Sequence, residues 1–340
     1  MQTHFNIAIL AAALVPVLFV LLLGYWAGRD HNFDQDQASG FSTLALNYAL
    51  PAALFVGMTK VSHEQLFQQG PLLLAVLICY CLVYGIVYML ARRSKTLGSK
   101  GAAVVALLVS FPAAPVYGVA VLQPLFGADS SITVGIVALI CNLALTPVTL
   151  AILSAGGDPA ASKTTPPKPG QAGKQPEQVG KQPEQAGKKN NIVVKTLESP
   201  LVWAPLAGVL LVIFGVHVPA LADDTLNLLG VSASGVAIFA SGMVLSAHKI
   251  TLSKQTWLIS LGKVIVEPAL FLVLLLLFSV KGTIGNAALV ATALPPAVVG
   301  VLLASKHKVA ESLAAATLFV TSVAMIVVLP LWVWISTLLK

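Results

Sequence analysis

The chain has 340 residues, of which 57% are hydrophobic and only 10% are charged. Soluble proteins carry roughly 25% charged residues, so this composition excludes an ordinary soluble protein. A mean hydropathy of +0.88 leaves too few polar side chains to cover a core in water, which predicts that the solvent is lipid. The formal net charge of +7 does not indicate a nucleic-acid partner, because seven of the twenty Lys and Arg residues lie in one polar stretch, 163–195.

Ten hydrophobic runs follow one another along the chain, each close to the roughly 20 residues that a helix needs to cross a bilayer. They cover residues 5–28, 38–59, 71–91, 101–126, 131–154, 197–221, 225–247, 256–279, 284–305 and 310–338. The first run is not expected to be a cleaved signal peptide, because residues 1–6 contain no Lys or Arg. The pattern predicts an all-α integral membrane protein with ten transmembrane helices.

The positive charges are distributed unevenly between alternate loops. One side of the membrane receives sixteen Lys and Arg residues and the other receives three, while Lys263 lies inside the eighth run. Because Lys and Arg are retained on the cytoplasmic side, both termini are expected to be extracytoplasmic, in a bacterial-type inner membrane.

The stretch 156–196 is rich in Pro, Gly, Gln and Lys, contains no aromatic residue, and repeats the sequence GKQPEQ from Gly173 and from Gly180. This composition predicts a flexible cytoplasmic linker. The linker divides the chain into a first five-helix repeat, 1–155, and a second five-helix repeat, 197–340.

Matching features recur at nearly constant offsets between the two halves. The offset is 183 for Pro112 and Pro295, 183 for Pro147 and Pro330, and 185 for Gly57 and Gly242. Because five spans are an odd number, duplicated halves would lie in opposite orientations. The sequence therefore predicts a 5+5 inverted repeat, a construction that places substrate sites between broken helices near the membrane midplane.

Two prolines interrupt the fourth run and two interrupt the ninth, in each case about 16 Å from the start of the run. Proline removes a backbone donor and clashes with the preceding turn, so both helices are expected to break. The half-helices that follow would point their positive N-terminal ends at one central region, which is suited to an anion. The alternative is a pair of packing kinks. The residues expected at the substrate site are Asn47, Pro51, Ser110, Pro112, Pro115, Tyr117, Pro295 and Pro296.

The eighth run contains two ionisable residues, Lys263 and Glu267, which share a helix face because they are four positions apart. Buried ionisable groups in membranes are candidates for function, here for coupling to an ion. Pro268 is expected to leave the carbonyl of Val264 without a partner beside the carboxylate. The alternative is a static ion pair that holds the helix in the bundle. Asn142 in the fifth run is expected to bond a neighbouring helix.

No other chemistry is indicated by the sequence. Cys79, Cys81 and Cys141 lie inside apolar runs, where small buried hydrophobes are expected. The chain contains no P-loop, nucleophile elbow, HExxH motif or dinucleotide fingerprint, so neither an enzyme nor a pump is predicted. No cofactor or metal is expected apart from a coupling ion, H⁺ or Na⁺.

The chain resembles the auxin efflux carrier family, and its bacterial malonate-type branch most closely. Three features carry this resemblance: the five-and-five division, the sequence LPAALF from Leu50 and the sequence ALPPA from Ala293. This resemblance implies an inverted repeat, a scaffold domain, a transport domain that moves by an elevator-like step, and a crossover of the fourth and ninth spans beside an organic-anion site. The sequence departs from the family in the fourth run: there an Asn and glycines usually precede the proline, whereas here Ser110, Pro112 and Pro115 occupy the equivalent stretch. The plan is also similar to that of the sodium–bile acid symporter group.

The function predicted is secondary transport of a small organic anion, a malonate-like carboxylate, by alternating access and symport. One alternative is a sodium-coupled symporter of bile-acid type, and another is a membrane sensor that binds a ligand without transporting it. The expected partners are the anion, the lipid bilayer and a second copy of the chain in a homodimer, with no nucleic acid.

Overall fold

The computed structural model describes residues 7–30, 33, 35–59, 69–94, 96–127, 130–154, 200–247 and 250–338. Every regular element in these residues is a helix, and their one β-type pairing is a single bridge between Pro112 and Pro296. The prediction of an all-α protein is therefore confirmed. The predicted linker, 156–196, lies outside the described residues.

The helices of the first half include three π-helical turns, written η. In chain order they are α1 (Ile7–Arg29), α2 (Gln35–Leu44), η1 (Ala45–Ala49), α3 (Leu50–Thr59), α5 (Gly70–Arg92), α6 (Gly98–Ser110), η2 (Ala114–Gly118), α7 (Val119–Phe126), α8 (Ser130–Ile140), η3 (Cys141–Leu145) and α9 (Thr146–Ser154).

The second half contains one π-helical turn among its described helices. They are α11 (Pro200–Ile213), α12 (Ala220–Ser246), α13 (Lys254–Leu261), η4 (Gly262–Val266), α14 (Glu267–Leu277), α15 (Gly282–Thr292), α16 (Val298–His307) and α17 (Glu311–Ser336).

Each of the ten predicted hydrophobic runs contains helix within the described residues. Six helical stretches there are long and apolar enough to cross a membrane: 12–29, 70–92, 130–154, 220–246, 254–277 and 311–336. The helices of the fourth and ninth runs are interrupted, as predicted, after Ser110 and after Thr292. The chain is thus a multi-pass membrane protein.

The helix of the sixth run is shorter than predicted, because α11 ends at Ile213 rather than near residue 221. Gly215 adopts a left-handed conformation with φ of +65°. The N–H of Val216 donates to the carbonyl of Leu211, and the N–H of Gly215 donates to that of Val212. These two bonds form a Schellman motif, which satisfies the last carbonyls of the helix and ends it.

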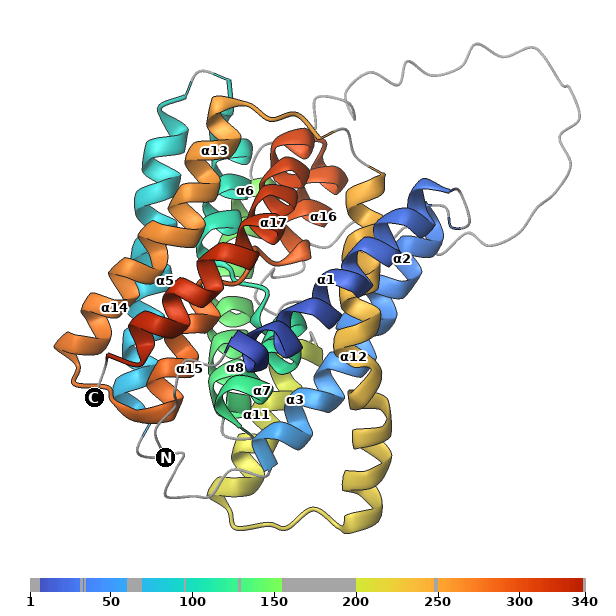
Figure 1. Cartoon of the computed structure of the whole chain (residues 1–340), viewed down its shortest axis with the longest axis vertical. Helices are drawn as coiled ribbons and strands as arrows, with labels where there is room; N and C mark the ends of the chain where they lie inside the picture. Colours follow the sequence, from blue (N-terminus) through green and yellow to red (C-terminus); the bar gives the residue numbers. More distant parts are fainter. Residues whose placement is uncertain are drawn as a thin grey trace, which may run out of the picture.

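Most of the helices pack in two groups, and α7 and α8 lie between them and contact both (Figure 1). The first group contains α1, α2, α3, α11 and α12, in which α1 packs along α12 and α11 packs along α3. The helices α5, α6, α9 and α13 to α17 form the second group, where α5 packs on α6 and α14, and α13 packs on α17. In Figure 1 the first group occupies the lower right of the molecule and the second group the upper left.

Glycines allow α1 and α12 to approach each other backbone to backbone. A Cβ atom on Gly242 would lie 2.1 Å from the carbonyl oxygen of Leu21, and one on Gly24 would lie 2.1 Å from that of Phe239. In lipid, small residues at a helix contact replace the hydrophobic effect with close van der Waals packing. Both positions therefore require glycine for the first group to assemble.

Candidate functional site

The two interrupted helices cross at their breaks and are bonded to each other there. The N–H of Ala113 donates to the carbonyl of Pro295, and the N–H of Ala297 donates to the carbonyl of Phe111, both at 2.8 Å. Because proline has no N–H, each break exposes backbone groups that cannot return to a helical ladder. Each break thus satisfies one donor and one acceptor of the other.

The two bonds of the crossing are related by a constant shift in sequence. Ala297 follows Ala113 by 184 residues, and Pro295 follows Phe111 by 184 residues, so each bond maps onto the other. The bridge pairs Pro112 with Pro296, one position beyond the offset of 183 noted in the sequence. The crossing therefore has local two-fold symmetry in its hydrogen bonds.

The half-helices that leave the crossing differ in the donors they offer. Pro115 has no N–H, and the N–H groups of Val116 and Tyr117 both donate to the carbonyl of Ala113. On the other side, no backbone carbonyl of the described residues accepts from Val298 or Val299, the first two residues of α16. By the same criterion only the N–H of Ala114 lacks a backbone acceptor at the start of η2, so the N-terminus of α16, with two such N–H groups, offers more donors to an anion.

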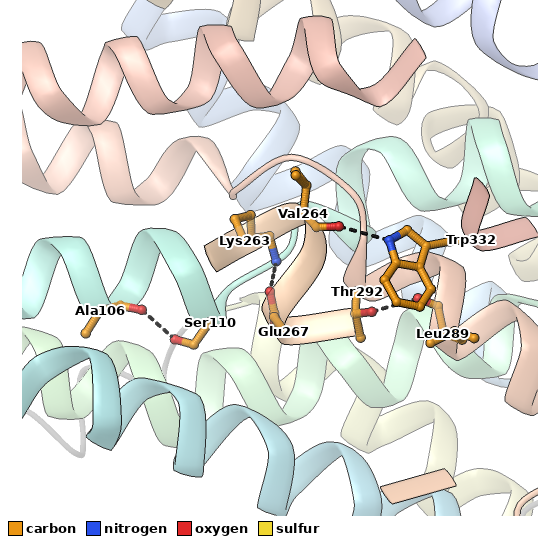
Figure 2. A network of polar contacts seen from close by, with 8 residues as sticks. All are labelled: Ala106, Ser110, Lys263, Val264, Glu267, Leu289, Thr292 and Trp332. Carbon is orange, nitrogen blue, oxygen red and sulfur yellow. Dashed lines mark hydrogen bonds and ion pairs between the residues drawn. The ribbon is translucent and has the colours of Figure 1, made fainter. Parts of the chain in front are cut away.

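The structure places the other predicted substrate residues in different environments. Pro51 is buried in α3, whereas Asn47 in η1 is exposed. Ser110 is fully buried at the end of α6, but its hydroxyl donates to the carbonyl of Ala106 at 2.8 Å (Figure 2). This hydroxyl was expected to donate to the anion, and in the structure its proton is already used. Tyr117 is fully buried in η2, and its hydroxyl has no hydrogen-bond partner in the described part of the chain.

Lys263 and Glu267 form the predicted ion pair. The Nζ of Lys263 lies 2.5 Å from the Oε2 of Glu267, and both side chains are 0% exposed. The second carboxylate oxygen, Oε1, is buried without a hydrogen-bond partner among the described residues. Figure 2 shows the pair beside Ser110 and Thr292, the last residues of α6 and α15 before the crossing. The negative C-terminal ends of these helices favour a buried ammonium group.

The carbonyl of Val264 has a partner, contrary to the expectation from the sequence. The indole N–H of Trp332 in α17 donates to it at 2.9 Å (Figure 2). Pro268 cannot supply the helical N–H, and the chain adopts the π turn η4, in which the N–H of Glu267 donates to the carbonyl of Gly262. Trp332 replaces the missing donor from another span, and no spacing in the sequence indicated this contact.

Three further titratable side chains lie near the ion pair. Cys79 and Cys141 lie within electrostatic range of both charges, and Tyr80 lies within range of Glu267. The hydroxyl of Tyr80 is buried without a hydrogen-bond partner in the described residues, and its ring stacks on Phe271 with centroids 6.5 Å apart. No group of three or more His, Cys, Asp or Glu residues suited to a metal occurs in the part of the chain described.

Asn142 also differs from its prediction. Its side-chain amide donates to the carbonyl of Ala138, one turn earlier in its own helix, at 2.8 Å. The Asn142 side-chain N–H thus bonds a carbonyl of its own helix, and this bond does not join two spans.

Comparison with known proteins gives a consistent result. The model of a family described as membrane transport protein matches residues 9–333. An uncharacterized transporter of Escherichia coli, YfdV, is 32% identical over 333 residues, which cover 96% of this chain and 98% of that protein. The YfdV protein of Shigella flexneri matches with the same identity and coverage. An uncharacterized transporter of Methanocaldococcus jannaschii is 22% identical over 325 residues, which cover 94% of this chain and 96% of that protein.

Proposed function

The chain belongs to the auxin efflux carrier family of membrane transport proteins, and on that premise we propose that it is a secondary transporter of a small, malonate-like carboxylate. The family and the relatives are transporters rather than enzymes. The proposal adds to this the class of substrate, the position of the site and the mode of movement.

The observation that carries the proposal is the bonded crossing at Pro112 and Pro296. Bonds between Ala113 and Pro295 and between Ala297 and Phe111 fix the two breaks, so that α16 begins at a defined point beside them. The free N–H groups of Val298 and Val299 and the positive end of the helix dipole favour a carboxylate there. Such a site binds an anion without the cost of burying an unpaired cation.

Elevator-type movement is supported by the packing of the helices in two groups. In this proposal the group of α1, α2, α3, α11 and α12 is the scaffold, and the group that contains the crossing moves along it with the bound anion. The pairing of α1 with α12 and of α3 with α11 is the pairing that an inverted repeat of ten spans would produce. The proposed orientation keeps both termini outside the cytoplasm and the linker inside it.

The proposed coupling group is Glu267, whose Oε1 is buried and unpartnered while Lys263 holds Oε2. Hard cations prefer several oxygen ligands. No group of three or more His, Cys, Asp or Glu residues suited to a metal includes Glu267 in the described part of the chain, and a single carboxylate can take up a proton, which favours H⁺ over Na⁺ as the coupling ion. Transport would then be a symport of the anion with H⁺.

The test is counterflow in proteoliposomes that contain the purified protein. Liposomes loaded with unlabelled malonate are expected to accumulate external radiolabelled malonate transiently. An inward proton gradient, with the outside more acidic than the inside, is expected to increase the rate of malonate uptake. Acetate, succinate and taurocholate serve as competitors in the same assay. Uptake of taurocholate that requires external Na⁺ would favour the bile-acid-type alternative, and binding without counterflow would favour a sensor.

A further inference from the structure

Trp332 in α17 has a counterpart in the first half of the chain. It lies two positions after Pro330, and Thr149 in α9 lies two positions after Pro147. The offset of 183 that relates the two prolines therefore also relates Trp332 to Thr149. Both side chains are buried, with 4% of Trp332 and 0% of Thr149 exposed. The two residues thus occupy corresponding places in the last hydrophobic run of each half.

Both side chains bond to the third hydrophobic run of their own half. The hydroxyl of Thr149 lies 2.9 Å from that of Tyr84 in α5. Thr149 donates its own proton to the carbonyl of Leu145 at 2.8 Å, so Tyr84 is the donor in their contact. The indole N–H of Trp332 donates to the carbonyl of Val264 in η4, also at 2.9 Å (Figure 2). Each half thus joins its last run to its third run by a buried hydrogen bond.

The two third runs differ in charge where these bonds are made. The same offset of 183 relates Tyr84 to Glu267 and Tyr80 to Lys263. The first half therefore holds two tyrosines at the positions where the second half holds the ion pair, of which neither side chain is exposed. The bond from Trp332 is the one of the two that reaches a segment with buried charges.

The carbonyl of Val264 belongs to the backbone that carries the ion pair. Val264 follows Lys263 directly, in the π turn that ends just before Glu267. Pro268 has no N–H to give to this carbonyl, so Trp332 supplies the donor that the helix lacks. Without the indole a buried carbonyl would be left unpaired, and the backbone of η4 is expected to rearrange in response. Such a rearrangement would change the distance between the ammonium group and the carboxylate.

We propose that Trp332 is a positioning residue for ion coupling, which acts on Glu267 through the backbone of η4. This inference rests on the proposed function, in which the anion is transported together with H⁺. Trp332 exchanges no proton itself in this role. Its bond keeps Lys263 against one carboxylate oxygen, Oε2, while the other oxygen, Oε1, has no partner among the described residues and is the one that receives the proton.

The position of η4 would then determine the pH range in which transport is coupled. A close ammonium group favours the charged form of a carboxylate, so a looser ion pair takes up a proton at higher pH. The titratable side chains near Glu267 are Lys263 on its own run, Cys79 and Tyr80 in α5, and Cys141 in η3. The helix α15, which also packs on α14, contains no titratable residue. A substitution in α17 changes none of these groups, so a shift in pH dependence would arise from the turn.

The experiment measures the initial rate of radiolabelled malonate uptake into malonate-loaded proteoliposomes at a series of pH values, with the same pH on both sides. Trp332→Phe removes the indole N–H and keeps an aromatic ring. It is expected to shift the midpoint of the pH dependence upward by about one pH unit, because a neighbouring cation changes the proton affinity of a carboxylate by about that much. Tyr84→Phe is the matched control, because it removes the corresponding hydrogen bond in the first half. Both variants are expected to lower the melting temperature, but Tyr84→Phe should keep the wild-type midpoint.

A second substitution tests the route through η4. Pro268→Ala introduces a backbone N–H four positions after Val264, so the helix itself can supply the donor that Trp332 otherwise gives. Combined with Trp332→Phe, it is expected to return the midpoint to the wild-type value. This double variant also decides the matter if Trp332→Phe alone does not fold. A double variant that does not fold, or whose midpoint stays shifted, would show that the indole does not act through this carbonyl, and the inference would be wrong.

The outcomes separate this inference from the proposed function. If malonate uptake by the wild-type protein depends on pH and Trp332→Phe has the same midpoint as Tyr84→Phe, the indole bond is a structural contact only. The inference is then wrong, while the proposed function stands. If uptake by the wild-type protein does not depend on pH, the proposed coupling to H⁺ fails and the inference fails with it.

Discussion

Trp332 and Val264 are joined by a 2.9 Å hydrogen bond between an indole N–H and a backbone carbonyl that lie 68 positions apart in the sequence. Pro268 leaves this carbonyl without its ordinary helical donor. The bond attaches α17 to the π turn η4, which carries Lys263, and the turn leads directly into Glu267. A contact between two spans thus holds in place the segment that contains the ion pair.

Replacing Trp332 by Phe is expected to lower the free energy of unfolding by about 1–3 kcal/mol, because it leaves the carbonyl of Val264 buried and unpaired. Thermal unfolding of the purified variant in detergent measures this change. Trp334→Phe is the control, since Trp334 lies on the same helix and its side chain is 50% exposed. Equal melting temperatures for the two variants would show that the indole N–H contributes nothing to stability.

The ion pair of Lys263 and Glu267 predicts opposite results for single and paired substitutions. Lys263→Ala leaves a fully buried carboxylate without its cation and is expected to cost about 3–5 kcal/mol, seen as poor expression and a lower melting temperature. Replacing both residues together by Met and Leu removes both charges and is expected to restore most of that stability.

Glu267→Gln tests whether the same pair couples transport to an ion. This substitution keeps the volume and removes the charge, so it is expected to abolish the pH dependence of malonate uptake. An unchanged pH profile in the Gln variant would leave the pair as a static element of the bundle. The stability measurements and the pH profile therefore separate the structural contribution of the pair from its contribution to transport.

The packing of α1 on α12 is tested by two glycines of the same helix. Gly242→Ala would place a Cβ atom 2.1 Å from the carbonyl of Leu21, and is expected to cost roughly 1–3 kcal/mol or more because backbone atoms must move. Gly235→Ala meets nothing within 4 Å and is expected to gain up to about 1 kcal/mol from helix propensity. Melting temperatures that change in the same direction for both variants would contradict this packing.

The positions of the helices could be predicted from the sequence, because a long apolar run in lipid can satisfy its backbone N–H and C=O groups in few ways other than as a helix. The breaks at Pro112 and Pro295 were predictable for the same local reason, since proline removes a donor wherever it occurs in a helix. The end of α11 was not predicted. A glycine in an apolar run is often tolerated within a membrane helix, and the left-handed conformation of Gly215 depends on the Schellman bonds that follow it.

The site was predicted less completely than the fold, because its contacts join distant positions. The pairing of Lys263 with Glu267 follows from a spacing of four residues, so it could be read locally. The contact of Trp332 with Val264 depends on how separate spans pack. The sequence also does not show which acceptor a buried serine in a helix will use. Ser110 donates to the backbone of its own helix, and another acceptor could have competed for its proton.

The last prediction concerns the crossing itself. Two double variants, Pro112→Ala with Pro115→Ala and Pro295→Ala with Pro296→Ala, permit the interrupted helices to continue, since alanine is favoured over proline by about 3 kcal/mol in a helix. A continuous helix would withdraw the backbone of Ala113 or Ala297 from the reciprocal bonds, and the site shared by both breaks would be lost. Each double variant alone is therefore expected to remove the increase in melting temperature that malonate gives the wild-type protein, an increase that follows from binding by mass action. Pro16→Ala is the control, because α1 continues through Pro16, and malonate is expected to stabilise this variant as it does the wild type. If both double variants retain the full stabilisation by malonate, the anion binds elsewhere and the prolines are packing kinks.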